Sequence, residues 1–211
     1  MKRITFPVGL YQCNCSILYC EETLEAVIVD PGDEGARITE MVEKKGLKVK
    51  YLLHTHAHLD HFGATADVKH KCNAKTVLHK DDLFLYEQSK VQSMMLGLPE
   101  VNTCPIDVFL EDGQVFSFGN EKVECLATPG HTPGSSCFCL EADNQQILLA
   151  GDTLFRNSIG RTDLPGGDFD TLKKSIKNRL YTLDGDCQVI PGHGGETLIG
   201  HEKRHNPFVQ A

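Results

Sequence analysis

Four side chains that commonly bind metal ions stand within six residues of one another, directly after the apolar run at 51–53. They are His56, His58, Asp60 and His61. Core packing gives no reason to gather three histidines and a carboxylate, whereas these are ordinary ligands of one or two cations. An extended segment points His56 and His58 the same way, and a turn after them can bring Asp60 and His61 to a second position. We therefore expect the chain to fold around a metal centre at the end of this strand.

Three further candidate ligands share one local context. Each follows an apolar run and a glycine, in the segments Pro129-Gly130-His131, Ala150-Gly151-Asp152 and Pro191-Gly192-His193. Glycine permits a tight turn that lifts the next side chain over the rim of a sheet. Loops at such rims often carry functional side chains. We therefore expect four strand ends to converge on one cleft.

Seven such ligands suit two divalent cations with one carboxylate between them. The predicted set is His56, His58 and His131 on one cation, Asp60, His61 and His193 on the other, and Asp152 as the bridge. Two cations roughly 3.5 to 4 Å apart would lower the pKa of a bridging water toward neutrality and polarise a carbonyl group. Histidine and carboxylate ligands can hold zinc, iron or manganese, and we expect zinc. His54 is expected to support the site rather than to bind a cation.

Apolar and alternating runs predict β-strands in both halves of the chain. These strands cover residues 4–8, 15–19, 26–29, 49–53, 123–127, 137–140, 147–150 and 189–190. Helical spacing predicts helices near 38–42, within 80–100 and over 169–180, the last with Asp168 as its N-cap. Met94 and Met95 are expected to pack in the core. The pattern predicts an α/β fold of layered sheets covered by helices, in one domain over residues 1–211.

Charge and composition narrow the classes of partner. The chain has 21 Lys and Arg against 29 Asp and Glu, a net charge of −8, which disfavours nucleic acid. No apolar stretch approaches the roughly 20 residues that span a bilayer, so we expect no membrane association. The sequence begins without a secretory leader pattern, which favours the reducing cytoplasm. In that compartment the pairs Cys13/Cys15 and Cys137/Cys139 are expected to be core residues of strands.

The motifs that carry these ligands resemble those of the metallo-β-lactamase superfamily. They are Thr-His-x-His-x-Asp-His at 55–61, Thr-Pro-Gly-His-Thr at 128–132, Gly-Asp-Thr at 151–153 and Pro-Gly-His-Gly at 191–194. All four occur in the family's order, and the resemblance covers nearly the whole chain. It implies an αββα sandwich that forms a single domain, with the metals in a cleft at one edge of the paired sheets.

Within that superfamily, residues 151–155 and 158–163 are similar to the short, type II glyoxalase II proteins, or hydroxyacylglutathione hydrolases. The resemblance implies hydrolysis of S-lactoylglutathione or a related small acyl thioester by a hydroxide that bridges the metals. It implies catalytic roles for Asp152 and for Asp60, which would steer the hydroxide proton. Arg161 becomes a candidate for binding the substrate anion or for a structural salt bridge. Longer glyoxalase II enzymes bind glutathione with a C-terminal extension, and this chain ends about 18 residues after His193, so the carrier thiol stays open.

Persulfide dioxygenases are the main alternative, because these oxidoreductases have a similar fold, first histidine motif and Gly-Arg-Thr-Asp segment. Their single iron would need only His56, His131 and Asp152. The Pro-Gly-His-Gly context of His193 favours the hydrolase. Lactamase activity is less expected, because those enzymes typically lack a carboxylate like Asp152. Phosphodiesterase activity is also less expected, and RNA processing is disfavoured because the chain is acidic and lacks a basic arm.

Overall fold

Two six-stranded sheets form the centre of the molecule. The computed structural model describes residues 1–142 and 145–210. The strand order is β1-β2-β3-β4-β5-β6 in the first sheet and β14-β13-β10-β9-β8-β7 in the second. Each sheet is therefore built from one continuous part of the chain, and β7 begins the second sheet shortly after β6 ends the first.

The first sheet changes from antiparallel to parallel at β3. Its strands are β1 (Lys2–Val8), β2 (Cys13–Tyr19), β3 (Glu25–Val29), β4 (Lys48–Leu53), β5 (Lys75–His79) and β6 (Val108–Leu110). The strands from β3 to β6 pair in parallel, so each needs a crossover connection. Helices α1 (Gly35–Lys45) and α3 (Thr65–Cys72) lie in the first two crossovers, and the short α2 (Leu59–Phe62) lies between β4 and α3. The carboxyl ends of these parallel strands thus share one edge.

The second sheet is mostly antiparallel. Its strands are β7 (Val115–Phe118), β8 (Glu121–Ala127), β9 (Ser136–Ala142), β10 (Gln145–Gly151), β13 (Gln188–Pro191) and β14 (Thr197–Leu198). The pair β10 and β13 is parallel, and α6 (Phe169–Ser175), continued by a π-helical turn at Ile176–Leu180, lies in the connection. A small hairpin of β11 (Leu154–Phe155) and β12 (Ser158–Ile159) precedes α6, and α7 (Ile199–His205) follows β14.

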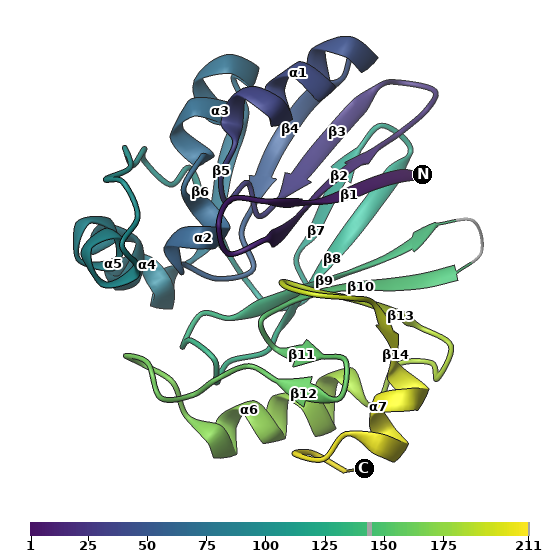
Figure 1. Cartoon of the computed structure of the whole chain (residues 1–211). Coiled ribbons are helices and arrows are strands. Elements are labelled where there is room, and N and C mark those ends of the chain that lie inside the picture. Colours follow the sequence, from purple (N-terminus) through teal and green to yellow (C-terminus); the bar gives the residue numbers. More distant parts are fainter. Residues whose placement is uncertain (143–144, 211) are drawn as a thin grey trace.

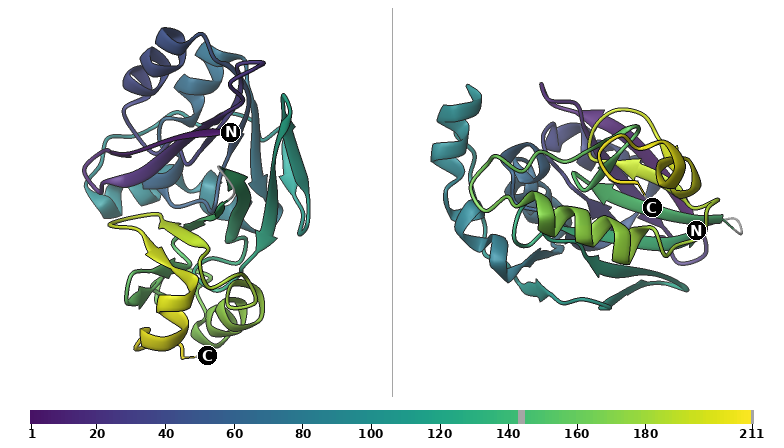
Figure 2. Two further views of the ribbon diagram at one scale, coloured as in Figure 1. Left: turned by 90° about the vertical axis from the view of Figure 1, so that its right-hand side faces the viewer. Right: turned by 90° about the horizontal axis from the view of Figure 1, so that it is seen from below.

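Four layers result from this arrangement. Figures 1 and 2 show α1 and α3 outside one sheet and α6 and α7 outside the other, with the strands between them. Apolar side chains from the two sheets, among them Leu53, Val77, Phe118 and Phe138, pack in the central core. The predicted αββα sandwich in a single domain is confirmed. Among the described residues no helix is long and apolar enough to cross a membrane.

All eight predicted strands are present, and each is longer than predicted by one to three residues. Strands β5, β6, β7, β11, β12 and β14 were not predicted, because most are too short to show a period in their apolar residues. The segment 80–100 is helical as predicted, but it divides into a 3-10 turn at Lys80–Asp82, α4 (Leu83–Glu87) and α5 (Ser89–Leu96).

The prediction that Met94 and Met95 pack in the core is wrong. Their side chains are 84% and 69% exposed. Helix α5 projects from the side of the sandwich in Figure 1, so it has too little neighbouring protein to bury both. The cysteine prediction holds for Cys13, Cys15 and Cys137, which are buried in strands β2 and β9, whereas Cys139 is partly exposed.

Helix α6 begins where the sequence predicts. The carboxylate of Asp168 accepts a hydrogen bond of 2.7 Å from the backbone N–H of Thr171, as an N-cap does. The helix then places Leu172 in the core between α6 and the second sheet. The backbone of Leu172 also lies against Gly130, where an added Cβ would stand 2.2 Å from the Leu172 nitrogen. Helix α6 therefore supports the loop that carries His131.

Replacing Leu172 with alanine should lower the free energy of unfolding by about 2 to 5 kcal/mol, because a fully buried leucine side chain leaves a cavity. Urea denaturation measures this change. The control is Phe169→Ala in the same helix, which removes a larger side chain that is 43% exposed. A loss for Leu172→Ala no larger than that for the control would contradict the packing described.

Candidate metal centre

The seven predicted ligands come from four strand ends, as expected. His56 and His58 lie in the segment after β4, and Asp60 and His61 lie in α2. The other three follow β8, β10 and β13, and they are His131, Asp152 and His193. Their donor atoms fall into groups of three that lie within 4.8 Å of one another, and the groups together contain all seven residues. The structure thus brings together every predicted ligand, while their role in metal binding stays a prediction.

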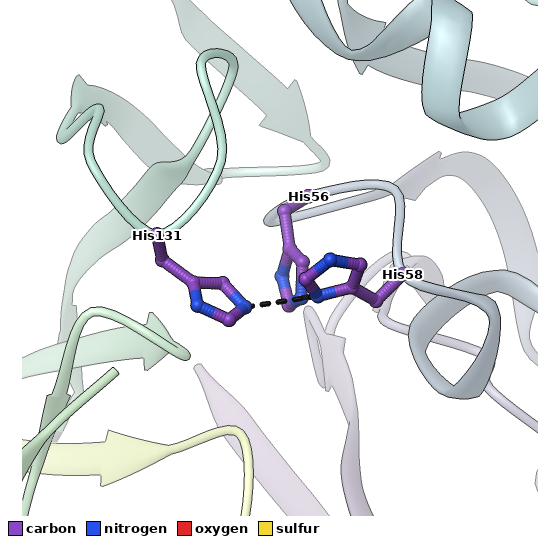
Figure 3. Close-up of side chains that lie close together, drawn as sticks. All are labelled: His56, His58 and His131. Atoms are coloured by element: carbon purple, nitrogen blue, oxygen red, sulfur yellow. Dashed lines mark hydrogen bonds between the residues drawn. The ribbon is translucent and has the colours of Figure 1, made fainter. Parts of the chain in front are cut away.

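The first group contains His56, His58 and His131, which converge from two sides of the cleft in Figure 3. The Nδ1 atom of His58 lies 3.1 Å from Nε2 of His56 and 2.9 Å from Nε2 of His131. Nitrogen ligands of a tetrahedral zinc ion lie about 2.0 to 2.1 Å from the metal, and therefore roughly 3.3 Å from one another. The observed separations match three ligands of one cation.

The second group contains Asp60, His61 and His193. The Nε2 atoms of His61 and His193 are 3.2 Å apart, and Nε2 of His193 is 3.2 Å from Oδ2 of Asp60. Asp152 stands between the two groups. Its Oδ1 atom is 3.4 Å from Nε2 of His61, whereas its Oδ2 atom is 3.7 Å from Nε2 of His131. One oxygen facing each group is the arrangement that a bridging carboxylate needs.

In four of the histidines, one ring nitrogen points away from the centre, and the hydrogen bond of this outer nitrogen decides which ring nitrogen carries the proton. Nδ1 of His131 donates to the backbone oxygen of Arg161 at 2.7 Å, and Nδ1 of His193 donates to that of Tyr11 at 2.8 Å. A carbonyl oxygen only accepts, so the proton is on Nδ1 and the lone pair of Nε2 points into the centre. Nδ1 of His61 likewise donates to Asp30 at 3.0 Å.

His56 follows the same rule through a hydroxyl group. Thr55 donates its hydroxyl proton to Asp30 at 2.7 Å, so its Oγ1 atom accepts from Nδ1 of His56 at 3.1 Å. The lone pairs of His56 and His131 therefore both face the Nδ1 atom of His58. Among the described residues, the buried Nε2 of His58 and Oδ1 of Asp152 have no hydrogen-bond partner. Two lone pairs thus converge on a nitrogen that can offer them at most one proton, and two buried polar atoms have no partner, so the donor set fits metal ions.

Protonation of the first group agrees with this fit. Burial, together with the charges of His61 and His131, lowers the pKa of His56 well below its usual value. Burial and His131 lower the pKa of His58 to about 3. Burial opposes ionisation of Asp152, but the nearby His61 and His131 outweigh it and hold its pKa below the ordinary range. Neutral imidazoles and an ionised carboxylate are the forms that bind metals.

The second group has a different balance. Burial by itself would lower the pKa of His193, but its hydrogen bond to Asp60 and the charge of Asp152 outweigh burial and raise it. The site therefore attracts positive charge at this position, either as a proton or as a metal ion.

Glycines allow the ligand loops to pass close to one another. An added Cβ on Gly192 would stand 2.1 Å from Oδ1 of Asp152 and 2.7 Å from the ring of His61. Gly151 has a φ of 47° and faces Thr55, whose Oγ1 atom would be 2.4 Å from an added Cβ. The strand-end glycines are thus required by close packing as well as by the turn.

Comparisons with known proteins agree with this geometry. A profile of the metallo-beta-lactamase superfamily matches residues 8–193. The chain belongs to the metallo-beta-lactamase superfamily. The hydroxyacylglutathione hydrolase GloC of Haemophilus influenzae is 39% identical over 207 residues, which cover 97% of this chain and 96% of that protein.

Two solved structures with a similar fold extend the comparison. The BLEG-1 B3 metallo-beta-lactamase is 34% identical, with a TM-score of 0.91 and full coverage of both chains. The protein TTHA1623 in a di-iron-bound form is 37% identical, with a TM-score of 0.85, and the match covers 98% of this chain and 100% of that one. These relatives, with the His and Asp groups of the structure, support a metal-dependent hydrolase.

Asp30 is a residue of the site that the sequence analysis did not identify. Its carboxylate accepts hydrogen bonds from the backbone N–H of Thr55 at 2.8 Å, from the Thr55 hydroxyl and from His61. Its φ of 51° lies in the left-handed region, which a non-glycine residue adopts at a cost. Its position directly after the buried strand β3 could have identified it from the sequence, because the predicted ligands also follow buried strands.

Asp82 was also missed, and it joins the two halves of the centre. Its buried carboxylate accepts hydrogen bonds from the N–H of Ala57 at 2.9 Å, the N–H of Gly134 at 2.6 Å and the hydroxyl of Thr132 at 2.8 Å. Ala57 lies between His56 and His58, and Thr132 follows His131 in the chain. Asp82 therefore holds two ligand segments at a set separation. Its sequence context, an exposed-looking Lys-Asp-Asp run, carried no signal of burial.

Arg161 lies at the rim of the centre and is already paired. Its guanidinium donates two hydrogen bonds to Asp163, at 2.7 and 2.8 Å, and both side chains are largely exposed. Its backbone oxygen holds His131, so the segment supports the centre, while substrate binding by its side chain stays a prediction. His54 is buried, with its ring nitrogens on the Val77 backbone oxygen and the Thr65 hydroxyl, and its role in supporting the site stays a prediction.

Replacing Asp30 with asparagine should weaken binding of the second metal by about 10- to 100-fold, because the amide cannot accept from Thr55 and from His61 as the carboxylate does. Asparagine tolerates the left-handed φ of this position, so the fold should persist. Zinc titration against a competing chelator measures the affinity. The control is Asp33→Asn, an exposed residue of the same turn. Equal metal affinity in the two variants would contradict the role assigned to Asp30.

Proposed function

We propose that this protein is a dinuclear thioesterase of the glyoxalase II type, which hydrolyses S-lactoylglutathione or a related acyl thioester. The observation that carries the proposal is the second ligand group, Asp60, His61 and His193, joined to the first by the carboxylate of Asp152. The similarity to a hydroxyacylglutathione hydrolase over nearly the full length supports the substrate class. We further propose a small molecule, and neither nucleic acid nor a membrane, as the partner.

The protein groups would divide the work as follows. Two bound divalent cations would supply an activated water and an electrophile for the substrate carbonyl. Asp60 would steer the proton of the attacking hydroxide: burial opposes its ionisation, but His61 and His193 outweigh burial and lower its pKa, so its carboxylate stays ionised and can accept a hydrogen bond. A thiol has a reference pKa of about 8.5, so the leaving group requires little protonation. None of the residues is assigned the role of a general acid, and thioester cleavage does not require one.

A mononuclear iron dioxygenase is the weaker proposal. It would use His56, His131 and Asp152 alone and would leave the second group without a function. Yet Nε2 of His193 is directed at Asp60 by its Nδ1 hydrogen bond to Tyr11, which is costly to maintain without a cation or proton beside it. We propose zinc as the metal, and iron is the alternative that the di-iron-bound TTHA1623 supports.

Lactam hydrolysis is a second candidate function, because the structural match to the BLEG-1 B3 metallo-beta-lactamase covers the full length of both chains. Both reactions begin with attack of an activated water on a carbonyl group, so one centre can serve either. The difference lies in the leaving group: a lactam nitrogen requires a proton, whereas a thiolate requires little. Hydrolysis of nitrocefin compared with that of S-lactoylglutathione distinguishes them.

Freshly purified protein should contain about two metal ions per chain and should hydrolyse S-lactoylglutathione. The Asp152→Ala variant should lose at least about 100-fold in kcat/KM, because both ions lose a shared ligand. Elemental analysis and a thiol-release assay measure these quantities. Asp170→Ala, which removes an exposed carboxylate on α6, serves as the matched control and should keep both metals and activity.

One iron per chain, with no thioester turnover and with oxygen consumption on glutathione persulfide, would overturn the proposal in favour of the dioxygenase. Two metals with turnover of nitrocefin alone would instead favour the lactamase.

A further inference from the structure

A cleft of about 240 Å³ opens directly above the metal ligands. His58, Asp60, His131 and Asp152 lie at its floor. One wall is formed by α4 and α5 with the adjoining residues, and the other by the loop after Arg161. The apolar side chains of these walls are Leu85, Val91, Met95, Leu96, Leu164 and Pro165. A substrate whose carbonyl group reaches the metals must therefore lie beside these apolar side chains.

Several of these apolar side chains are exposed to solvent. Met95 is 69% exposed and Val91 is 51% exposed, although both face the cleft. Solvent-exposed apolar side chains grouped at a concave site gain free energy when a ligand covers them. Methionine in particular adapts its shape to different apolar partners. The wall thus has surface that an apolar ligand would bury.

The charges around the cleft do not favour a strongly anionic ligand group away from the metals. Arg161 is the one Lys or Arg among the described residues that line the cleft. Its guanidinium already donates two hydrogen bonds to Asp163. The remaining polar groups of the walls are Tyr11, Gln88 and Gln92. Gln92 is itself committed to the backbone of Leu59, Ala57 and Leu85. An extended charged carrier would therefore find few free cationic partners here.

We propose that α5 and the 164–165 loop form an apolar subsite that binds the hydrocarbon group of the thioester substrate, on either the acyl or the thiol side of the scissile bond. The proposal rests on the thioesterase function above. It assigns Val91 and Met95 as specificity residues that contact substrate without taking part in the chemistry. The preferred substrates are then thioesters with an apolar group next to the reacting carbonyl or sulfur.

The test is a series of thioesters that differ only in hydrocarbon length. In one arm, acetyl, butanoyl and hexanoyl thioesters of N-acetylcysteamine vary the acyl side. In the other, acetyl thioesters of ethanethiol, butanethiol and hexanethiol vary the thiol side. In the arm whose group enters the cleft, kcat/KM should rise about two- to fourfold per methylene until the chain outgrows the cleft.

Two neighbouring methionines provide a matched pair of variants. Met95→Glu places a charge in the subsite and should abolish the dependence on chain length, while the shortest substrate of each arm changes much less. Met94→Glu adds the same charge one residue away, at a side chain that does not line the cleft and is 84% exposed, and it should keep the dependence. Because both positions are exposed, both variants should fold.

The outcomes separate the subsite from the function on which it rests. Turnover of the thioesters with no dependence on length in either arm overturns the subsite and leaves the thioesterase standing. Equal effects of Met94→Glu and Met95→Glu also overturn the subsite, because general charge would then explain them. Absence of turnover for every thioester overturns the proposed function and the subsite together.

Discussion

The convergence of histidine and aspartate electron pairs on one small region is the constraint on which the structure depends. The lone pairs of His56 and His131 face His58, and that of His193 faces the carboxylate of Asp60. Hydrogen bonds at the outer nitrogens of His131 and His193 fix the orientation of these rings. The centre therefore gathers more electron pairs than protons, which is what cations complete.

The arrangement requires both sheets at once. The segment with His56 to His61 follows a strand of the first sheet, whereas His131, Asp152 and His193 follow strands of the second. The apolar core between the sheets sets their separation, and Asp82 ties a ligand loop of one half to a ligand loop of the other. Changes in the central core should therefore reach the centre by moving one set of ligands relative to the other.

Chemistry and substrate selection come from different parts of this fold. The ligands stand at the ends of packed strands, where a small displacement costs contacts across the core. The walls of the cleft come from α5 and the 164–165 loop, which lie at the periphery and have fewer contacts. Exposed positions of these segments, such as Val91 and Met95, can change in sequence without a contact to the candidate ligands, whereas Gln92 of α5 hydrogen-bonds the segment that carries them. Variation at such positions is how one superfamily scaffold can serve several reactions.

The sequence by itself determined the seven candidate ligands, eight of the strands and the layered architecture, because each depends on local spacing: apolar runs, strand-end glycines and two histidines separated by one residue. Tertiary structure alone decided the positions of Asp30 and Asp82 beside the ligands, the exposure of Met94 and Met95, and the remaining strands, most of which are short. Their partners are distant in sequence, as Asp82 and Thr132 are, or depend on how much protein surrounds a helix. Neither property leaves a periodic pattern in the chain, so packing had to supply it.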